Sequence, residues 1–140
     1  MRRMPLIIAV GALVVCGAIA SPAAAVPPKC NDQSNQMELD VCADQEFKAA
    51  DTALNRSYSE IQKRLADDAD GKKRLTVAQK AWIGFRDAEC DFQTFNSKDG
   101  SIYPMIVSEC LTAMTKKRTE ELKVYLNCEE GDLSCPVPAP

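Results

Sequence analysis

The chain has 140 residues, with 17 basic and 20 acidic side chains and no histidine, so its formal net charge is −3. This acidic balance argues against nucleic acid and anionic membrane surfaces as partners, because both require basic patches. The lack of histidine removes the commonest general base and the commonest nitrogen ligand for metals.

Residues 1–25 carry the pattern of a Sec-type signal peptide. Two arginines precede an apolar run, and Ala23–Ala25 form an A-x-A cleavage site. The apolar run is shorter than the ~20 residues that span a bilayer, which disfavours a transmembrane helix. Cys16 raises the alternative of a lipid anchor, but Val15 stands where a lipobox has a small residue. We therefore expect a soluble periplasmic or extracellular protein, without a lipid on Cys16.

Removal of this segment leaves a mature chain of 115 residues with a net charge near −5, which suits one small domain. An even number of cysteines in a small exported domain predicts a disulfide framework. Zinc binding is the alternative, but the chain has no C-x2-C pair and the spacings are irregular. The six cysteines are Cys30, Cys42, Cys90, Cys110, Cys128 and Cys135.

A long helix is predicted from Asn35 to about Ala66. Asn35 with Glu38 three residues later forms a capping-box pattern at its start. Gly71 is expected to close the helix in the left-handed conformation that follows many helix ends. Apolar residues recur at helical spacing and predict the face toward the core: Ala43, Phe47, Ala50, Leu54, Tyr58, Ile61 and Leu65.

A second helix is predicted from about Lys72 to Gln93. Its spacing of three and four residues predicts an inner face made of Leu75, Ala78, Trp82, Phe85, Glu89 and Phe92.

A third helix follows the turn-rich segment 96–101, with Ser101 as the expected N-cap and Pro104 in the first turn. Its expected inner stripe contains Val107, Leu111, Met114, Arg118, Leu122 and Tyr125. Residues 129–140 contain three prolines and are expected to form an extended tail.

Three helices joined by short loops predict an all-α fold, a small antiparallel three-helix bundle stapled by disulfides. A rise of ~1.5 Å per residue gives the first helix roughly 48 Å and the second roughly 32 Å. The first helix should therefore overhang near residues 35–44, with little to pack against. Six cysteines allow about 15 pairings, and helix geometry favours the local set Cys30–Cys42, Cys90–Cys110 and Cys128–Cys135.

Trp82, Arg86 and Asp87 are the candidate partner-binding residues. Trp82 and Arg86 lie four apart and share a helix face, and an exposed Trp–Arg pair is a typical hot spot. The competing interpretation buries Trp82 and stacks the guanidinium on an aromatic ring or pairs it with a carboxylate such as Glu89.

The pattern indicates a protein that is not an enzyme, with no catalytic residues, no cofactor and no metal site. A catalytic cysteine needs a free thiol and a base, and a paired-carboxylate site needs a sugar-sized cleft. A slim helical bundle with six bridged cysteines offers neither.

The chain resembles the family of the LprI-like lysozyme-inhibitor N-terminal domain. The motif W-x2-F-R-D-x2-C runs from Trp82 to Cys90, framed by Cys30, Cys42 and Cys110. The resemblance covers about residues 30–125, which places the domain at residues 26–128 and a proline-rich tail at 129–140. It implies an exported helical binding protein with a protein partner, a basic lysozyme among the candidates. The alternative is a structural or adaptor module of the bacterial envelope with no role toward lysozyme.

Overall fold

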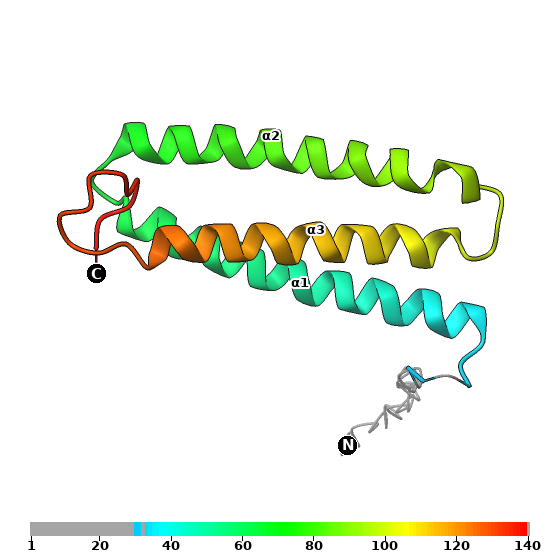
Figure 1. Cartoon of the computed structure of the whole chain (residues 1–140). Helices are drawn as coiled ribbons and strands as arrows, with labels where there is room; N and C mark the ends of the chain where they lie inside the picture. Colours follow the sequence, from blue (N-terminus) through cyan, green and yellow to red (C-terminus); the bar gives the residue numbers. More distant parts are fainter. Residues whose placement is uncertain (1–29, 32, 140) are drawn as a thin grey trace, which may run out of the picture.

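The computed structural model describes residues 30, 31 and 33–139, so the predicted signal peptide and Cys16 lie outside the described residues. Three helices build the fold, and no strand occurs among the described residues (Figure 1). The predicted all-α, three-helix fold is therefore confirmed. The helices are α1 (Gln36–Arg64), α2 (Ala69–Thr94) and α3 (Tyr103–Leu126), with a short 3-10 helix η1 (Phe95–Ser97) after α2.

Helix α1 begins with the predicted capping box. The backbone N–H of Glu38 donates to the Asn35 side chain at 3.1 Å, and the Asn35 N–H donates to the Glu38 carboxylate at 3.0 Å. Two backbone donors that have no partner within the helix are thereby satisfied. The predicted face is also confirmed, because Ala43, Ala50 and Leu54 are buried along it.

Helix α2 begins earlier than predicted, and the prediction for Gly71 is wrong. Asp68 caps α2 by accepting a hydrogen bond from the Gly71 N–H at 2.8 Å, so Gly71 lies in the first turn. Among the described glycines only Gly131 has a positive φ. An added Cβ at position 71 would collide with the Asp68 carboxylate, so this capping side chain would have to shift.

Helix α3 begins at Tyr103, one residue later than an N-cap at Ser101 would place its start. Ile102 takes the N-cap position, without a side-chain hydrogen bond, and Ser101 belongs to the preceding turn. Pro104 lies in the first turn as predicted, where its missing N–H costs no helical hydrogen bond.

The helices alternate in direction, and α3 packs along α1 (Figure 1). Helix α2 contacts both of them, α1 through the hydroxyl pair Tyr58–Thr76 at 3.1 Å and α3 through Arg86 and Thr115. The start of α3 covers the start of α1, since the Gln36 amide lies 3.9 Å from the Met105 sulfur. The predicted overhang of α1 is therefore wrong. It assumed that α2 limits the length of the bundle, whereas α3 supplies the cover.

The apolar core occupies the half of the bundle where α1 ends. Leu54, Ile61 and Leu65 of α1 meet Leu122 of α3 there. Val137 of the C-terminal tail completes this core and is only 4% exposed. The sequence predicts the tail as an extended segment, and the structure adds that its one valine beyond Cys135 closes the end of the bundle.

The inner face of α2 differs from the predicted one. Its buried residues are Gln79, Arg86, Cys90 and Thr94, whereas Phe85 and Phe92 are 59% and 69% exposed. The prediction that these two aromatic rings face the core is wrong. On this face the guanidinium of Arg86 contacts the buried Thr115 of α3, and two further threonines of α3, Thr112 and Thr119, are also buried.

Three cysteine pairs join neighbouring segments, and each pair has Cα atoms 5.7–5.9 Å apart. Cys30–Cys42 ties the leading segment to α1, and Cys90–Cys110 ties α2 to α3 beside the η1 turn. Cys128–Cys135 closes the loop that follows α3. These are the pairs that the hairpin geometry favoured.

Candidate functional site

Arg86 occupies the centre of the bundle, where α2 faces both α1 and α3. Its side chain is 10% exposed, and its guanidinium lies 5.4 Å from the Phe47 ring centroid and 5.3 Å from that of Trp82. The Nε and Nη2 groups bind Asp87 at 2.9 and 2.8 Å, and Nη1 donates to the Thr115 hydroxyl at 3.3 Å. A planar, weakly hydrated guanidinium suits an environment that combines aromatic rings with several hydrogen-bond acceptors.

The ring of Trp82 contacts the guanidinium groups of two arginines. Arg118 of α3 places its guanidinium 5.9 Å from the Trp82 ring centroid, in addition to Arg86 at 5.3 Å. Arg118 also donates to Gln79 at 3.3 Å and pairs with Glu121 at 2.9 Å. Trp82 therefore joins α2 to α3 through one cation–π contact, with Arg118, while its contact with Arg86 lies within α2.

Of the three candidate partner-binding residues, only Asp87 lies on the surface. Its side chain is 55% exposed, Trp82 is half-buried, and Arg86 is buried. Arg86 thus follows the structural interpretation, with Phe47, Trp82 and Asp87 as its partners in place of the suggested Glu89. Its guanidinium positions helices and is not available as a surface anchor.

Charge separates the two halves of the bundle. The acidic half, which we define as described residues 30–51 and 84–113, contains ten acidic and three basic residues, a net charge of −7. The other half, residues 52–83 and 114–139, contains nine acidic and eleven basic residues, a net charge of +2. The ten acids are Glu38, Asp40, Asp44, Glu46, Asp51, Asp87, Glu89, Asp91, Asp99 and Glu109.

The three basic residues of the acidic half have different environments. Arg86 is buried, and Lys48 pairs with Asp44 at 2.6 Å. Lys98 lies in the turn between η1 and α3, is exposed, and makes no ion pair within the described chain. This turn forms one tip of the bundle, where α2 connects to α3 (Figure 1). Lys98 is therefore an exposed lysine without an ion-pair partner in the described chain, at the tip of the acidic half.

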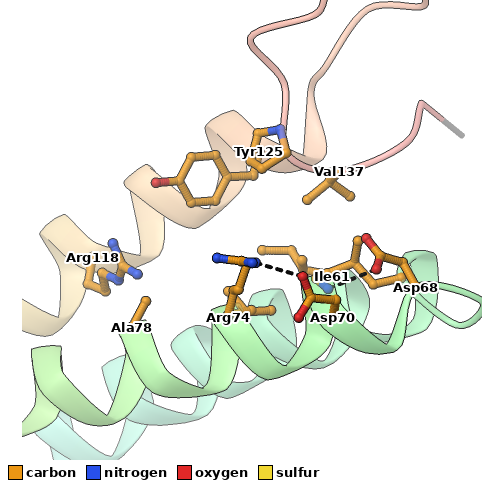
Figure 2. Close-up of a pocket in the computed structure, with 12 residues that line it drawn as sticks. Ile61, Asp68, Asp70, Arg74, Ala78, Arg118, Tyr125 and Val137 are labelled. Carbon is orange, nitrogen blue, oxygen red and sulfur yellow. Dashed lines mark hydrogen bonds and ion pairs between the residues drawn. The ribbon is translucent and has the colours of Figure 1, made fainter.

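A groove of about 390 Å³ lies in the opposite half, between α2, α3 and the tail (Figure 2). The groove has an apolar lining that includes Ile61, Tyr125 and Val137. Both arginines that line the groove are paired with carboxylates, Arg74 with Asp70 at 2.9 Å and Arg118 with Glu121 at 2.9 Å. Their charges are therefore already compensated within the chain.

The described residues contain no group of three or more His, Cys, Asp or Glu side chains placed to hold a metal ion. None of the helices in this described part is both long and apolar enough to cross a membrane. In the tail, the hydroxyl and backbone N–H of Ser134 both donate to Asp132, which lowers the pKa of this exposed carboxyl below its usual 3.8.

Sequence reasoning missed two features of this surface. Arg118 was read as an interruption of an apolar stripe, although an arginine one helix away from a lone tryptophan is a signal for stacking. The separation of charge was also missed. It can be found by counting charges along each predicted helix, because residues 36–51 of helix α1 contain five acids and one lysine.

The comparisons with known proteins agree with this architecture. The model of the family described as lysozyme inhibitor LprI matches residues 29–122. The chain is 38% identical over 130 residues to the uncharacterised protein R02472 of Rhizobium meliloti, with coverage of 85% of this chain and 94% of that protein. It is 27% identical over 113 residues to the uncharacterised protein YecT of Escherichia coli, covering 71% and 70% of the two chains.

No solved structure matches the chain significantly. The family match covers well over half of the chain and includes every helix of the fold up to Leu122. The chain therefore belongs to the LprI lysozyme-inhibitor family.

Proposed function

We propose that this protein is an exported, non-catalytic binding protein that inhibits a basic lysozyme-type muramidase in the periplasm or outside the cell. The family description supports the inhibitor class, and the disulfide pairs agree with an exported protein. The observation that carries the proposal is the acidic half of the bundle, with its net charge of −7.

The acidic half provides the electrostatic complement of a basic enzyme. A surface of one sign steers an oppositely charged partner into encounter and raises the association rate, an effect that falls with salt. The opposite half of the bundle has a net charge of +2 and repels the same partner weakly. The charge separation therefore orients the inhibitor with its acidic half toward the enzyme.

Lys98 is the residue that we assign to the substrate cleft. Glycosidases of the lysozyme type use two carboxyl groups that flank the scissile bond. Lys98 lies in the turn at the tip of the acidic half, is exposed, and has no ion-pair partner in the described chain. When the acidic half approaches the enzyme, this ammonium group is free to reach the catalytic carboxyl groups and block the cleft.

A turbidity assay of bacterial cell walls with lysozyme tests the proposal. Purified mature protein should slow clearing in a dose-dependent way, more strongly at low salt than at moderate salt. An absence of inhibition at a micromolar excess at both salt concentrations would sink the proposal.

A matched pair of variants tests the role of the acidic half. Asp99→Lys/Glu109→Lys reverses two exposed carboxylates that form no ion pair in the structure. We expect it to weaken inhibition about tenfold at low salt, mainly through the association rate. Glu129→Lys/Glu130→Lys makes the same change of net charge in the opposite half and should change inhibition much less.

A single substitution tests Lys98 independently of the fold. Lys98→Ala should raise the concentration needed for half-inhibition by about 10- to 100-fold, as for a hot-spot residue. Lys117→Ala removes an equal charge from an exposed site on α3, in the opposite half of the bundle, and serves as the control. Equal effects of the two substitutions would leave the acidic half as the binding surface and remove Lys98 from the cleft.

A further inference from the structure

The outward face of α2 carries an exposed apolar stripe. Four of its residues are large and strongly exposed: Val77 at 62%, Phe85 at 59%, Phe92 at 69% and Phe95, in the adjoining η1, at 54%. The rings of Phe92 and Phe95 stack with centroids 6.2 Å apart. Exposed apolar patches of this kind mark interaction surfaces when they are contiguous. The complete stripe consists of Val77, Ala81, Gly84, Phe85, Ala88, Phe92 and Phe95, all exposed.

The stripe has the spacing of a helix–helix interface. Positions 77, 81, 84, 88, 92 and 95 follow one another at intervals of three or four residues, so they share one side of α2. This side is opposite the buried residues Gln79, Arg86 and Cys90. The residues at its middle are small, Ala81, Gly84 and Ala88, and the large ones lie toward its ends. Small central residues allow two helix backbones to approach closely.

None of the described residues packs against Gly84. A Cβ atom at this position would meet nothing within 4 Å. Glycine inside a helix nevertheless costs about 1 kcal/mol relative to alanine. A close approach by a second helix at this point accounts for a glycine that the fold of one chain does not require.

Charged residues beside the stripe indicate which helix approaches. Lys73 and Lys80 flank the first half of the stripe, and Asp87 and Asp91 flank the second half on the same side. Asp87 uses one carboxylate oxygen, Oδ1, for Arg86. In an antiparallel pair of identical helices, Lys80 of each copy faces Asp87 of the other. In a parallel pair the twofold axis would run along the helices, so this flank would face the opposite flank of the partner and the Lys80–Asp87 pairs would not form.

We propose that α2 docks antiparallel on α2 of a second copy of this chain, about a twofold axis near Gly84. The same arrangement sets the acidic half of each copy beside the weakly basic half of the other. Such an interface is self-complementary, as a twofold dimer requires. Because one helix pair buries less than a large permanent interface, we expect a dimer with a dissociation constant on the order of micromolar. This inference does not depend on inhibition of lysozyme.

Two complementary variants of the mature chain test the arrangement. In the proposed register Val77 of each copy meets Phe92 of the other. Val77→Lys and Phe92→Glu should each be largely monomeric in sedimentation velocity, since each buries an unpaired charge against an apolar side chain. An equimolar mixture should recover dimers, because one Lys–Glu pair and one unchanged Val–Phe contact form between the two chains.

Controls separate the interface from the fold. Val124→Lys places a lysine on another exposed apolar position, 68% exposed on α3 and outside the stripe, and should leave the dimer unchanged. Gly84→Arg should abolish the dimer while the helical circular dichroism signal is retained. A wild-type chain that is monomeric at about 100-fold above the expected dissociation constant would overturn the proposal. A dimer that survives Gly84→Arg, or a mixture that stays monomeric, would overturn it equally.

Discussion

Helices α1 and α2 have similar lengths and opposite surfaces. Helix α1 buries Leu54 and Ile61 and exposes charged residues such as Lys48 and Lys63. Helix α2 buries Gln79 and Arg86 and exposes aromatic rings. The first arrangement is that of a core helix. The second arrangement is not explained by the stability of one chain, and it indicates that the outer face of α2 is used for an interaction.

The apolar face of α1 should be the most sensitive part of the molecule. Leu54→Ala removes a side chain that is 1% exposed and should lower the free energy of unfolding by about 3 kcal/mol. Arg56→Ala, on the exposed side of the same helix, should change it by less than about 0.5 kcal/mol. Urea unfolding followed by circular dichroism measures both, and equal effects would break the contrast between the two faces.

The Cys90–Cys110 pair anchors α2, which otherwise meets its neighbours largely through polar side chains. Replacing both cysteines with serine should lower the free energy of unfolding by about 2–3 kcal/mol. Peptide mapping without reduction checks the pairing itself. A link from Cys30 or Cys42 to Cys128 or Cys135 would contradict the arrangement described here.

Arg86 should contribute to stability through its stacked contacts. Arg86→Ala removes the contacts with Phe47, Trp82 and Thr115, and we expect a loss of about 2 kcal/mol. Arg86→Lys keeps the charge but loses the forked geometry, so it should recover only part of this loss. The fluorescence of Trp82 should change in both variants, because each of them alters the guanidinium contact with the Trp82 ring. If Arg86→Lys had the same free energy of unfolding as the unsubstituted protein, the positive charge alone would account for the contribution of Arg86.

The exposed rings of α2 should contribute least to the stability of one chain. Phe85→Ser or Phe92→Ser should change the free energy of unfolding of the monomer by less than about 0.5 kcal/mol, measured at dilutions that favour the monomer. A loss above 2 kcal/mol would place these rings in the core, as the helical pattern had first predicted.

The sequence predicts α1 well because the apolar spacing and the N-terminal capping residues indicate the same helix. Asn35, Glu38 and the stripe through Leu54 all indicate the same helix and the same face. The prediction of α2 is confirmed for Leu75 and Trp82, which pack against the core. It is wrong for the two phenylalanines, because apolar periodicity alone does not say which side of a helix meets the core. Phe85 and Phe92 have the right spacing for a core and nevertheless face outward.

Two other errors have local causes. Gly71 follows a helix in sequence, but Asp68 captures its N–H and begins a new helix there. The buried threonines of α3 were missed because a threonine is polar by type. Thr112 and Thr119 become compatible with burial once each hydroxyl donates to a backbone carbonyl one turn earlier, at 2.7 and 2.8 Å.

We propose that the acidic half binds a basic lysozyme-type enzyme. Surface plasmon resonance of the mature protein over immobilised lysozyme, at low and moderate salt, measures this binding. We predict binding with an association rate that falls as salt rises, and that falls at low salt in Asp99→Lys/Glu109→Lys but not in Glu129→Lys/Glu130→Lys. An absence of binding at low salt, or binding that is indifferent to both salt and the Asp99→Lys/Glu109→Lys reversal, would contradict the claim.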